Sequence, residues 1–210
     1  MRPTGLLLDL DGTLVDSEPL QRAGYRAFFA ARGWAAPDLG MFTGRRAEDV
    51  FLAEPGAWIG HDPAQLAAEV RALVPRDVPP AAVPGARECV LAAVAAGVPV
   101  AIVTSAGPDW VALAGDALGV FDRVDLVVTA EDVVDGKPHP AGFALACDRL
   151  GIAPPGAIAV EDSPAGVRAA VAAGIGLVVG VTTSRTVGEL TAAGAQATYA
   201  DLRPVAALLR

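Results

Sequence analysis

Carboxylates, hydroxyls and a lone lysine stand directly after apolar stretches of this sequence. They are Asp9 and Asp11 in LDLDGTL, Thr104 and Ser105 in IVTSAG, Lys137 in DGKPHP, and Glu161 and Asp162 in VEDSPAG. Carboxylates crowded together repel unless a cation joins them or some of them take up protons. Hard oxygen ligands that leave room for water favour Mg²⁺. The set therefore predicts a carboxylate–Mg²⁺ site whose lysine and hydroxyl donors suit the oxygens of a phosphate group.

Asp9 and Asp11 could divide the work of phosphate transfer between them. Two-residue spacing at the end of a strand directs both side chains to the same face, and Gly12 lets the chain turn sharply after them. One carboxylate could attack phosphorus to form an aspartyl-phosphate while the other shuttles protons. The spacing alone leaves open which carboxylate takes which role.

Lys137 is the only lysine in the chain, against fifteen arginines. Arginine suits bidentate contacts on open surfaces, whereas lysine presents a compact point charge on a thin stem. We expect Lys137 to share a small rim with Asp9, Asp162 and a transferring phosphoryl group, where a guanidinium would be too broad. Gly136 and Pro138 would aim the stem.

The elements that position these residues alternate along most of the chain. Strand-like apolar runs cover residues 5–10, 98–104, 124–130, 156–162 and 174–181. Helical patterns cover residues 84–97, 108–119, 139–151 and 163–174, several with proline near the start and glycine at the end. Near-continuous apolar strands are typical of strands buried on both faces. The alternation predicts an α/β fold with a Rossmann-like parallel sheet, which gathers the polar residues at the carboxyl ends of its strands.

Residues 16–83 break this alternation, because no convincing buried strand appears there. The helical patterns of this segment are residues 18–33, 62–74 and, more weakly, 46–54. The proline-rich stretch 74–85 suits a return linker. We expect a small all-α insert at 16–83, placed after the first strand of a core formed by residues 1–15 and 84–210.

Composition restricts the partners of the protein. The chain has 210 residues, of which 53% are hydrophobic, and a net charge of −8, which argues against nucleic acid and anionic membranes as partners. The two cysteines, Cys89 and Cys147, match no metal-ligand spacing and suit a core in a reducing compartment. Asp9 and Asp11 interrupt the first apolar stretch, so no signal peptide is evident. These features predict a soluble, cytoplasmic protein, and they favour a monomer.

The ordered motifs DLDGTLVDSEP, VTS, GKPHP and VEDSPAG resemble the four motifs of the haloacid dehalogenase-like hydrolase superfamily across the whole core. The stretches AIVTSAGPD, DGKPHPAGF, VEDSPAGVRAA and VGVTTS are similar to those of phosphatases acting on glycerol phosphate and deoxyglucose phosphate, in the β-phosphoglucomutase-like branch. The resemblance implies a Mg²⁺-dependent phosphatase of small phosphorylated sugars or polyols. It also implies that the insert is a helical cap that closes over the site and excludes water.

The same resemblance implies a role for each residue of the core motifs. Asp9 would be the nucleophile, and Asp11 the general acid and then the base. Thr104 would hold the phosphoryl oxygens with the main chain of Ser105, and Lys137 would neutralise their charge.

The metal-binding roles are likewise implied by the resemblance. Asp162 would bind Mg²⁺ together with Asp9 and the carbonyl oxygen of Asp11. Glu161 would serve as an outer ligand.

Three residues of the insert are candidates for contact with substrate. Arg46, in FTGRRAED, stands in a pattern that resembles related sugar- and glycerol-phosphatases, where the arginine can face the substrate; the alternative is a solvated arginine at the start of a helix. Glu18 and Gln21 lie one helical turn apart just after the first motif and could face the same site.

Other chemistries of the superfamily fit the residues less well. A dehalogenase needs no acid at Asp11, and phosphonate cleavage needs a cap lysine, which the insert lacks. The nearest alternative is a sugar phosphomutase, but such mutases carry a histidine where this chain has Gln21 and an arginine where it has Ala47. A non-enzymatic phospho-receiver module would carry its acceptor aspartate on a later strand, whereas the strand that ends at Thr104 offers none.

Overall fold

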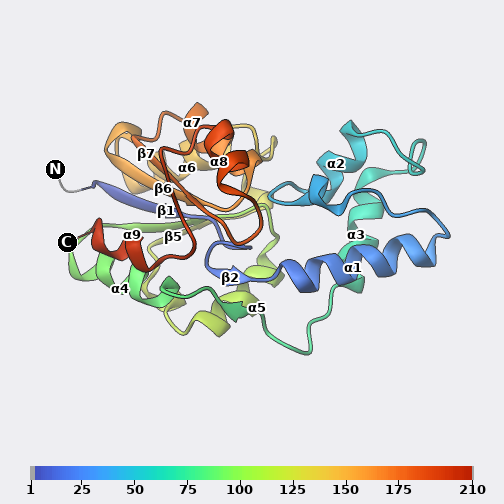
Figure 1. Ribbon diagram of the computed structural model, residues 1–210, viewed down its shortest axis with the longest axis horizontal. Coiled ribbons are helices and arrows are strands. Elements are labelled where there is room, and N and C mark those ends of the chain that lie inside the picture. Colours follow the sequence, from blue (N-terminus) through green and yellow to red (C-terminus); the bar gives the residue numbers. More distant parts are fainter. Residues whose placement is uncertain (1–2, 210) are drawn as a thin grey trace.

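A six-stranded parallel sheet forms the centre of the computed structural model, which describes residues 3–209 (Figure 1). The strands are β1 (Gly5–Leu8), β4 (Val100–Val103), β5 (Leu126–Val128), β6 (Ala157–Glu161), β7 (Leu177–Val181) and β8 (Ala197–Tyr199). Their order is β5-β4-β1-β6-β7-β8. The predicted α/β class and Rossmann-like parallel sheet are therefore confirmed, and β1 lies between β4 and β6.

The register of the central strands brings their carboxyl ends to one level. Leu8 of β1 is paired with Ile102 of β4 and with Val160 of β6. The backbone N–H of Asp9 then donates to the carbonyl of Val160. Whatever follows each of these strands is thus delivered to the same edge of the sheet.

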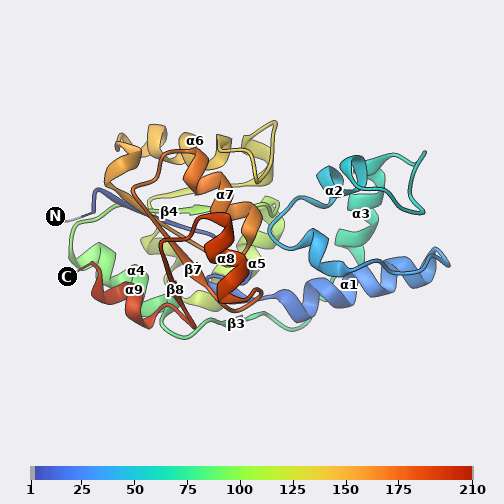
Figure 2. The ribbon, with the colours of Figure 1, turned by 45° about the horizontal axis from the view of Figure 1, so that its top comes forward.

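Helices cover both faces of the sheet (Figure 2). One face carries α4 (Ala86–Ala95), α5 (Pro108–Leu118) and α9 (Arg203–Ala207), and the other carries α6 (Ala141–Leu150), α7 (Pro164–Ala172) and α8 (Val187–Ala193). Leu6 and Leu8 pack among the first set, and Leu7 packs among the second. This alternation explains why β1 is apolar at every position.

Sequence signals set the ends of several helices. Pro108 stands in the first turn of α5, and Gly119 ends that helix in the left-handed region with a φ of 62°. Gly151 ends α6 in the same way, with a φ of 67°. Short 3₁₀ helices at Leu39–Phe42, Phe121–Arg123, Ala130–Asp132 and Pro154–Gly156 complete the connections.

The segment between β1 and α4 forms a helical insert, as the sequence predicts. It contains α1 (Glu18–Ala31), α2 (Ala47–Ala53) and α3 (Pro63–Leu73). The chain enters and leaves through two short antiparallel strands, β2 (Val15–Asp16) and β3 (Ala81–Ala82). In Figure 1 the insert lies to the right of the sheet, beyond the carboxyl ends of its strands.

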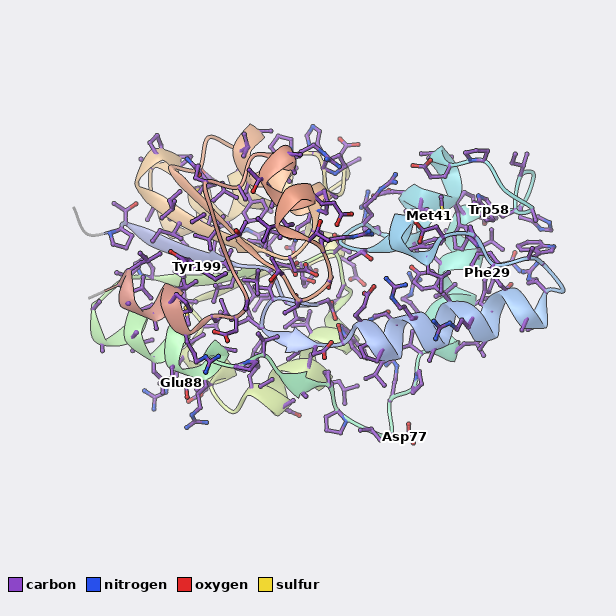
Figure 3. All side chains as sticks on the ribbon, in the orientation of Figure 1. Phe29, Met41, Trp58, Asp77, Glu88 and Tyr199 are labelled. Atoms are coloured by element: carbon purple, nitrogen blue, oxygen red, sulfur yellow. The ribbon has the colours of Figure 1, made fainter. Side chains whose placement is uncertain are left out.

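The insert has a small core of its own, built largely from aromatic rings. Figure 3 shows Phe29, Met41 and Trp58 within it. The buried members are Tyr25, Phe28, Phe29, Leu39, Phe42, Val50, Phe51, Trp58, Leu66 and Val70. Large rings let a short segment bury enough apolar area to hold its helices together.

Two further features of the helices concern their thiols and their length. Cys89 and Cys147 are free and buried, as expected for core residues. Along residues 3–209, none of the helices is both long enough and apolar enough to traverse a bilayer.

Candidate active site

The residues singled out in the sequence converge at the carboxyl edge of the sheet. Asp9 follows β1, Thr104 follows β4, and Glu161 ends β6 with Asp162 directly behind it. Lys137 reaches the same place from the segment between β5 and α6. Five positions spread over more than 150 residues of chain thus meet at one edge, as the parallel topology requires.

Lys137 lies at the centre of a buried network. Its Nζ donates to Asp9 Oδ1 at 2.6 Å, to Glu161 Oε1 at 2.6 Å and to the carbonyl of Val103 at 2.8 Å. These three acceptors use all three ammonium protons, and the residue is only 6% exposed. Burial lowers the pKa of Lys137, but the carboxylates of Asp9 and Glu161 more than offset this and hold the pKa above its ordinary value.

Glu161 is the second carboxylate that Lys137 binds in this network. It is fully buried, and its Oε2 accepts a hydrogen bond from Ser163 Oγ at 3.1 Å. A side chain at position 166 would collide with the carboxylate, which could move aside only by giving up its contacts with Lys137 and Ser163. Burial raises the pKa of Glu161 to about 7, against the lowering effect of Lys137.

Asp162 is the residue whose surroundings indicate a metal. Both of its carboxylate oxygens are buried and accept no hydrogen bond of good geometry from residues 3–209. Burial raises the pKa of Asp162 well above the ordinary value, although the nearby Ser184 hydroxyl opposes the rise. Carboxylate oxygens of Asp9, Glu161 and Asp162 all lie within 4.8 Å of one another. Orphaned buried carboxylate oxygens are costly unless a cation or proton satisfies them. An all-oxygen set of this charge fits Mg²⁺.

Asp11 is held differently from Asp9. Its Oδ1 accepts hydrogen bonds from Ser17 Oγ at 2.5 Å and from Trp110 Nε1 at 2.7 Å. Burial raises the pKa of Asp11 to about 6, and the nearby Asp9 adds to the rise while the two hydrogen bonds oppose it. A carboxyl group with such a pKa can hold a proton near neutral pH and release it to a neighbour.

Thr104 and Ser105 occupy the turn after β4. Thr104 Oγ1 accepts from the N–H of Ala106 at 3.0 Å, a local turn contact that leaves its own proton free to donate elsewhere. Ser105 Oγ donates to the carbonyl of Gly44 at 3.1 Å and so joins the core to the insert.

A cavity of about 1010 Å³ lies between this edge and the insert. Its lining includes the core residues Asp9, Asp11, Thr104 and Ser105 and the predicted insert residues Glu18, Gln21 and Arg46. Lys137, Glu161 and Asp162 are not part of that lining; they lie buried behind Asp9. The structure therefore brings all the predicted residues to one site. Some of them line the cavity, and the others are buried behind Asp9.

The insert residues differ in how they are held. Glu18 pairs with Arg22 at 2.7 Å and accepts from Thr43 Oγ1 at 3.2 Å. Gln21 follows one turn later on the same helix and also lines the cavity. Their contact with a substrate stays a prediction.

Arg46 is occupied by protein partners. Its guanidinium binds both carboxylate oxygens of Asp49, at 2.7 and 2.8 Å, and donates to the carbonyls of Val133 at 3.2 Å and Val134 at 2.6 Å. Its side chain is 10% exposed, so the alternative of a solvated arginine is wrong. The residue bridges the insert to the core segment after β5.

Several lining residues were missed by sequence reasoning. They are Arg22, Tyr25, Arg71, Arg76 and Trp110. Arg22 carries a weak signal, because it stands four residues after Glu18 on a predicted helix. The other residues reach the cavity through the packing of their helices and loops, which the spacing of residues in the sequence does not predict.

Several curated relatives of the chain are phosphatases by their names. The chain is 40% identical over 182 residues to the validoxylamine A 7'-phosphate phosphatase of Streptomyces hygroscopicus subsp. limoneus, with 85% of each chain covered. It is 36% identical to hexitol phosphatase A of Escherichia coli (83% of this chain and 81% of the relative) and 31% identical to the phosphoglycolate phosphatase of Yersinia pestis (97% and 93%).

Solved structures share the fold over nearly the whole chain. A hydrolase from Pseudomonas syringae has a TM-score of 0.83 at 25% identity, with 95% of this chain and 94% of that chain covered. The β-phosphoglucomutase of Clostridium difficile has a TM-score of 0.79 at 18% identity, with 98% and 93% covered. The model of the haloacid dehalogenase-like hydrolase family matches residues 3–174. The chain belongs to that family and is a phosphoric monoester hydrolase, and it shares its fold with β-phosphoglucomutase.

Proposed function

We propose that this chain hydrolyses phosphate monoesters of small sugars or polyols through an aspartyl-phosphate formed on Asp9. The observation that carries the proposal is the position of Asp9. It lines the cavity, while its Oδ1 is anchored from behind by Lys137 at 2.6 Å. One carboxylate oxygen is thereby fixed, and the other is left to attack phosphorus.

Asp11 serves as the proton carrier in this proposal. It lines the same cavity, and burial raises its pKa to about 6, so it can protonate a departing alkoxide near neutral pH. The carboxylate that remains can then take a proton from the water that hydrolyses the aspartyl-phosphate. The separate surroundings of Asp9 and Asp11 support separate roles.

The transferred phosphoryl group would be held by donors from two strands. Thr104 and Ser105 line the cavity beside Asp9, and the hydroxyl proton of Thr104 has no acceptor among residues 3–209. Lys137 contributes its positive charge from beneath Asp9. Charge neutralisation and oriented donors are what phosphoryl transfer requires of a protein.

Mg²⁺ would be held by Asp9, Asp162, the carbonyl oxygen of Asp11 and, as an outer ligand, Glu161. The unpartnered oxygens of Asp162 support this assignment. The bound ion would supply positive charge that neutralises the phosphate and lets four carboxylates coexist at the site.

The insert acts as a cap in this proposal, spanning residues 16–83, with residues 1–15 and 84–210 as the hydrolase core. Contacts that support a closed arrangement cross this boundary at several places. Ser105 binds the carbonyl of Gly44, and Arg46 binds the carbonyls of Val133 and Val134. Closure over Asp9 would exclude water until the aspartyl-phosphate has formed.

The cavity favours a substrate larger than phosphoglycolate. Its volume of about 1010 Å³ is at the upper end of ordinary ligand pockets. Glu18, Gln21 and Tyr25 line it and offer hydrogen-bonding groups suited to hydroxyls. The relatives at 40% and 36% identity act on validoxylamine A 7'-phosphate and hexitol phosphates by their names, which agrees with a polyhydroxylated leaving group.

A phosphomutase of the β-phosphoglucomutase type is the second candidate, because the fold is shared with such an enzyme. Gln21 and Ala47 stand where mutases carry a histidine and an arginine, and this favours hydrolysis. Phosphate release should be measured across triose, pentose, hexose and polyol phosphates and phosphoglycolate, with and without Mg²⁺. Free phosphate from a sugar or polyol phosphate supports the proposal. A phosphorylated isomer in its place would establish the mutase.

A further inference from the structure

Asp11 is held through a single carboxylate oxygen by two donors from distant parts of the chain. Ser17 Oγ and Trp110 Nε1 both donate to Oδ1, at 2.5 and 2.7 Å. No residue within the described range 3–209 donates to Oδ2. Since Asp11 lines the cavity, Oδ2 is the oxygen left for a bound molecule.

Ser17 donates to Asp11 in place of the helix-capping hydrogen bond that a serine at its position usually makes. It occupies the N-cap position of α1, where a serine side chain usually accepts from a backbone N–H of the first turn. Its side chain makes no capping hydrogen bond, and its hydroxyl donates to Asp11 instead.

Trp110 supplies the second donor from the first turn of α5. It is 6% exposed, and its ring packs in the hydrophobic cluster on one face of the sheet, so the position of the indole is fixed by the core. An indole has one N–H and no acceptor, and its hydrogen bond to Asp11 is therefore one-directional.

We propose that Trp110 is a positioning residue that, together with Ser17, keeps the exchangeable proton of Asp11 on Oδ2. The inference rests on the proposed role of Asp11 as acid and base. Two donors occupy the lone pairs of Oδ1, so a proton on that oxygen would be repelled by the protons of the Trp110 N–H and the Ser17 O–H. The same two hydrogen bonds prevent the carboxyl group from rotating and exchanging its oxygens.

The proton then has a defined path. As an oxygen of Asp9 bonds to phosphorus, the ester P–O bond breaks, its electron pair stays on the leaving oxygen, and that oxygen takes the proton from Oδ2. In the second half, water bonds to phosphorus and gives a proton to Oδ2, while the bond between Asp9 and phosphorus breaks. The donors to Oδ1 stay in place in both halves, because Oδ1 is an acceptor in both protonation states.

The test compares leaving groups in Trp110→Phe, which keeps an aromatic ring and removes the N–H. We expect kcat/KM for the best sugar or polyol phosphate to fall about tenfold, with less than about a threefold loss for p-nitrophenyl phosphate, whose leaving group needs no proton. Ser17→Ala removes the other donor and should show the same selectivity. It keeps the proposal testable if Trp110→Phe does not fold by circular dichroism.

Asp11→Asn provides the reference. In that background, Trp110→Phe should cause no further loss of selectivity between the two substrates, because there is no proton left to position. Equal losses on both substrates, or an undiminished effect in the Asp11→Asn background, would show that Trp110 is merely structural. Failure of the proposed function is a separate result: Asp9→Asn would then retain turnover of the sugar phosphate.

Discussion

The core and the helical insert bury their side chains with different chemistry. The sheet and its helices pack leucine, valine, isoleucine and alanine into two layers, one on each face of the strands. The insert contains seven of the eleven aromatic residues of the chain: Tyr25, Phe28, Phe29, Trp34, Phe42, Phe51 and Trp58. Their rings stack in a single cluster, for example Phe28 on Phe51 with ring centroids 5.6 Å apart.

The site is divided in the same way. On the core side, backbone register places Asp9 and Asp162, and the buried Lys137 locks their surroundings. On the insert side, Glu18 and Gln21 project from one helix, and their positions depend on how the insert meets the core. In the proposed function, the core determines the reaction and the insert determines which molecule undergoes it. Substitutions in the two parts should therefore differ in size and in the kinetic constant affected.

The largest effect is expected for Asp9→Asn. Loss of the attacking oxygen should lower kcat by at least about 10⁴-fold. The fold should persist, because Glu161 still pairs with Lys137 at 2.6 Å. Phosphate release and thermal unfolding measure the two quantities. Retention of substantial turnover would contradict the assignment of the nucleophile.

Lys137→Arg should have the next largest effect, although it conserves charge. The buried ammonium has three acceptors within 2.8 Å, and a broad guanidinium cannot take the same three contacts without displacing Asp9. We expect a loss of about 100-fold in kcat and about 1–3 kcal/mol in the free energy of unfolding.

A matched exchange in the insert provides the control for Lys137→Arg. Arg26 is exposed on α1, so Arg26→Lys should leave both quantities unchanged. Full activity in Lys137→Arg would show that the lone lysine has no geometric role.

Removal of Mg²⁺ should lower the stability of the fold moderately, and the size of this loss should depend on pH. Burial raises the folded-state pKa of Asp11 to about 6 and of Glu161 to about 7, and it raises that of Asp162 well above its ordinary value. Unfolded carboxyl groups titrate near about 4, so the folded state binds more protons between about pH 4 and 7. Metal-free protein therefore loses stability as pH rises through this window.

Melting temperatures at pH 5.5 and 8 test this expectation. Added Mg²⁺ should raise the melting temperature more at pH 8, since it then replaces the missing protons as counter-charge. In Asp162→Asn the response to Mg²⁺ should shrink. An equal rise in that variant would place the ion elsewhere.

The smallest effect is expected for Arg46→Ala. Its guanidinium is engaged by Asp49 and by the carbonyls of Val133 and Val134, so its removal should loosen the contact between insert and core. We expect KM to rise roughly three- to tenfold for a sugar phosphate and for p-nitrophenyl phosphate alike, with kcat little changed. A rise confined to the sugar phosphate would show that Arg46 binds the substrate directly.

Much of the core was predictable because its signals are local. Continuous apolar runs identify β1, β4, β5, β6 and β7, and parallel topology alone brings Asp9, Thr104 and Asp162 to one edge. The short β8 and the helices α8 and α9 were missed, since three to seven residues carry too little periodicity.

Side-chain partnerships between distant segments were not predictable. Trp110 meets Asp11 across 99 residues, and Arg46 meets Val133 across 87. Such contacts depend on the final packing of elements, whereas spacing reports only on neighbours within one element. The contacts of the cap can therefore be identified only from the structure, whereas the four motifs already indicate the residues at the catalytic edge of the sheet.

Mapping the phosphorylated residue during turnover tests the central claim most directly. The protein would be quenched with acid while it hydrolyses a sugar or polyol phosphate, and its peptides would be analysed by mass spectrometry. The phosphate should be found on Asp9 and should be absent from Asp9→Asn, whereas substitutions in the insert should change how much accumulates and not where. Phosphate on Asp11 or Asp162, or turnover that labels no aspartate, would contradict the division of labour between core and cap.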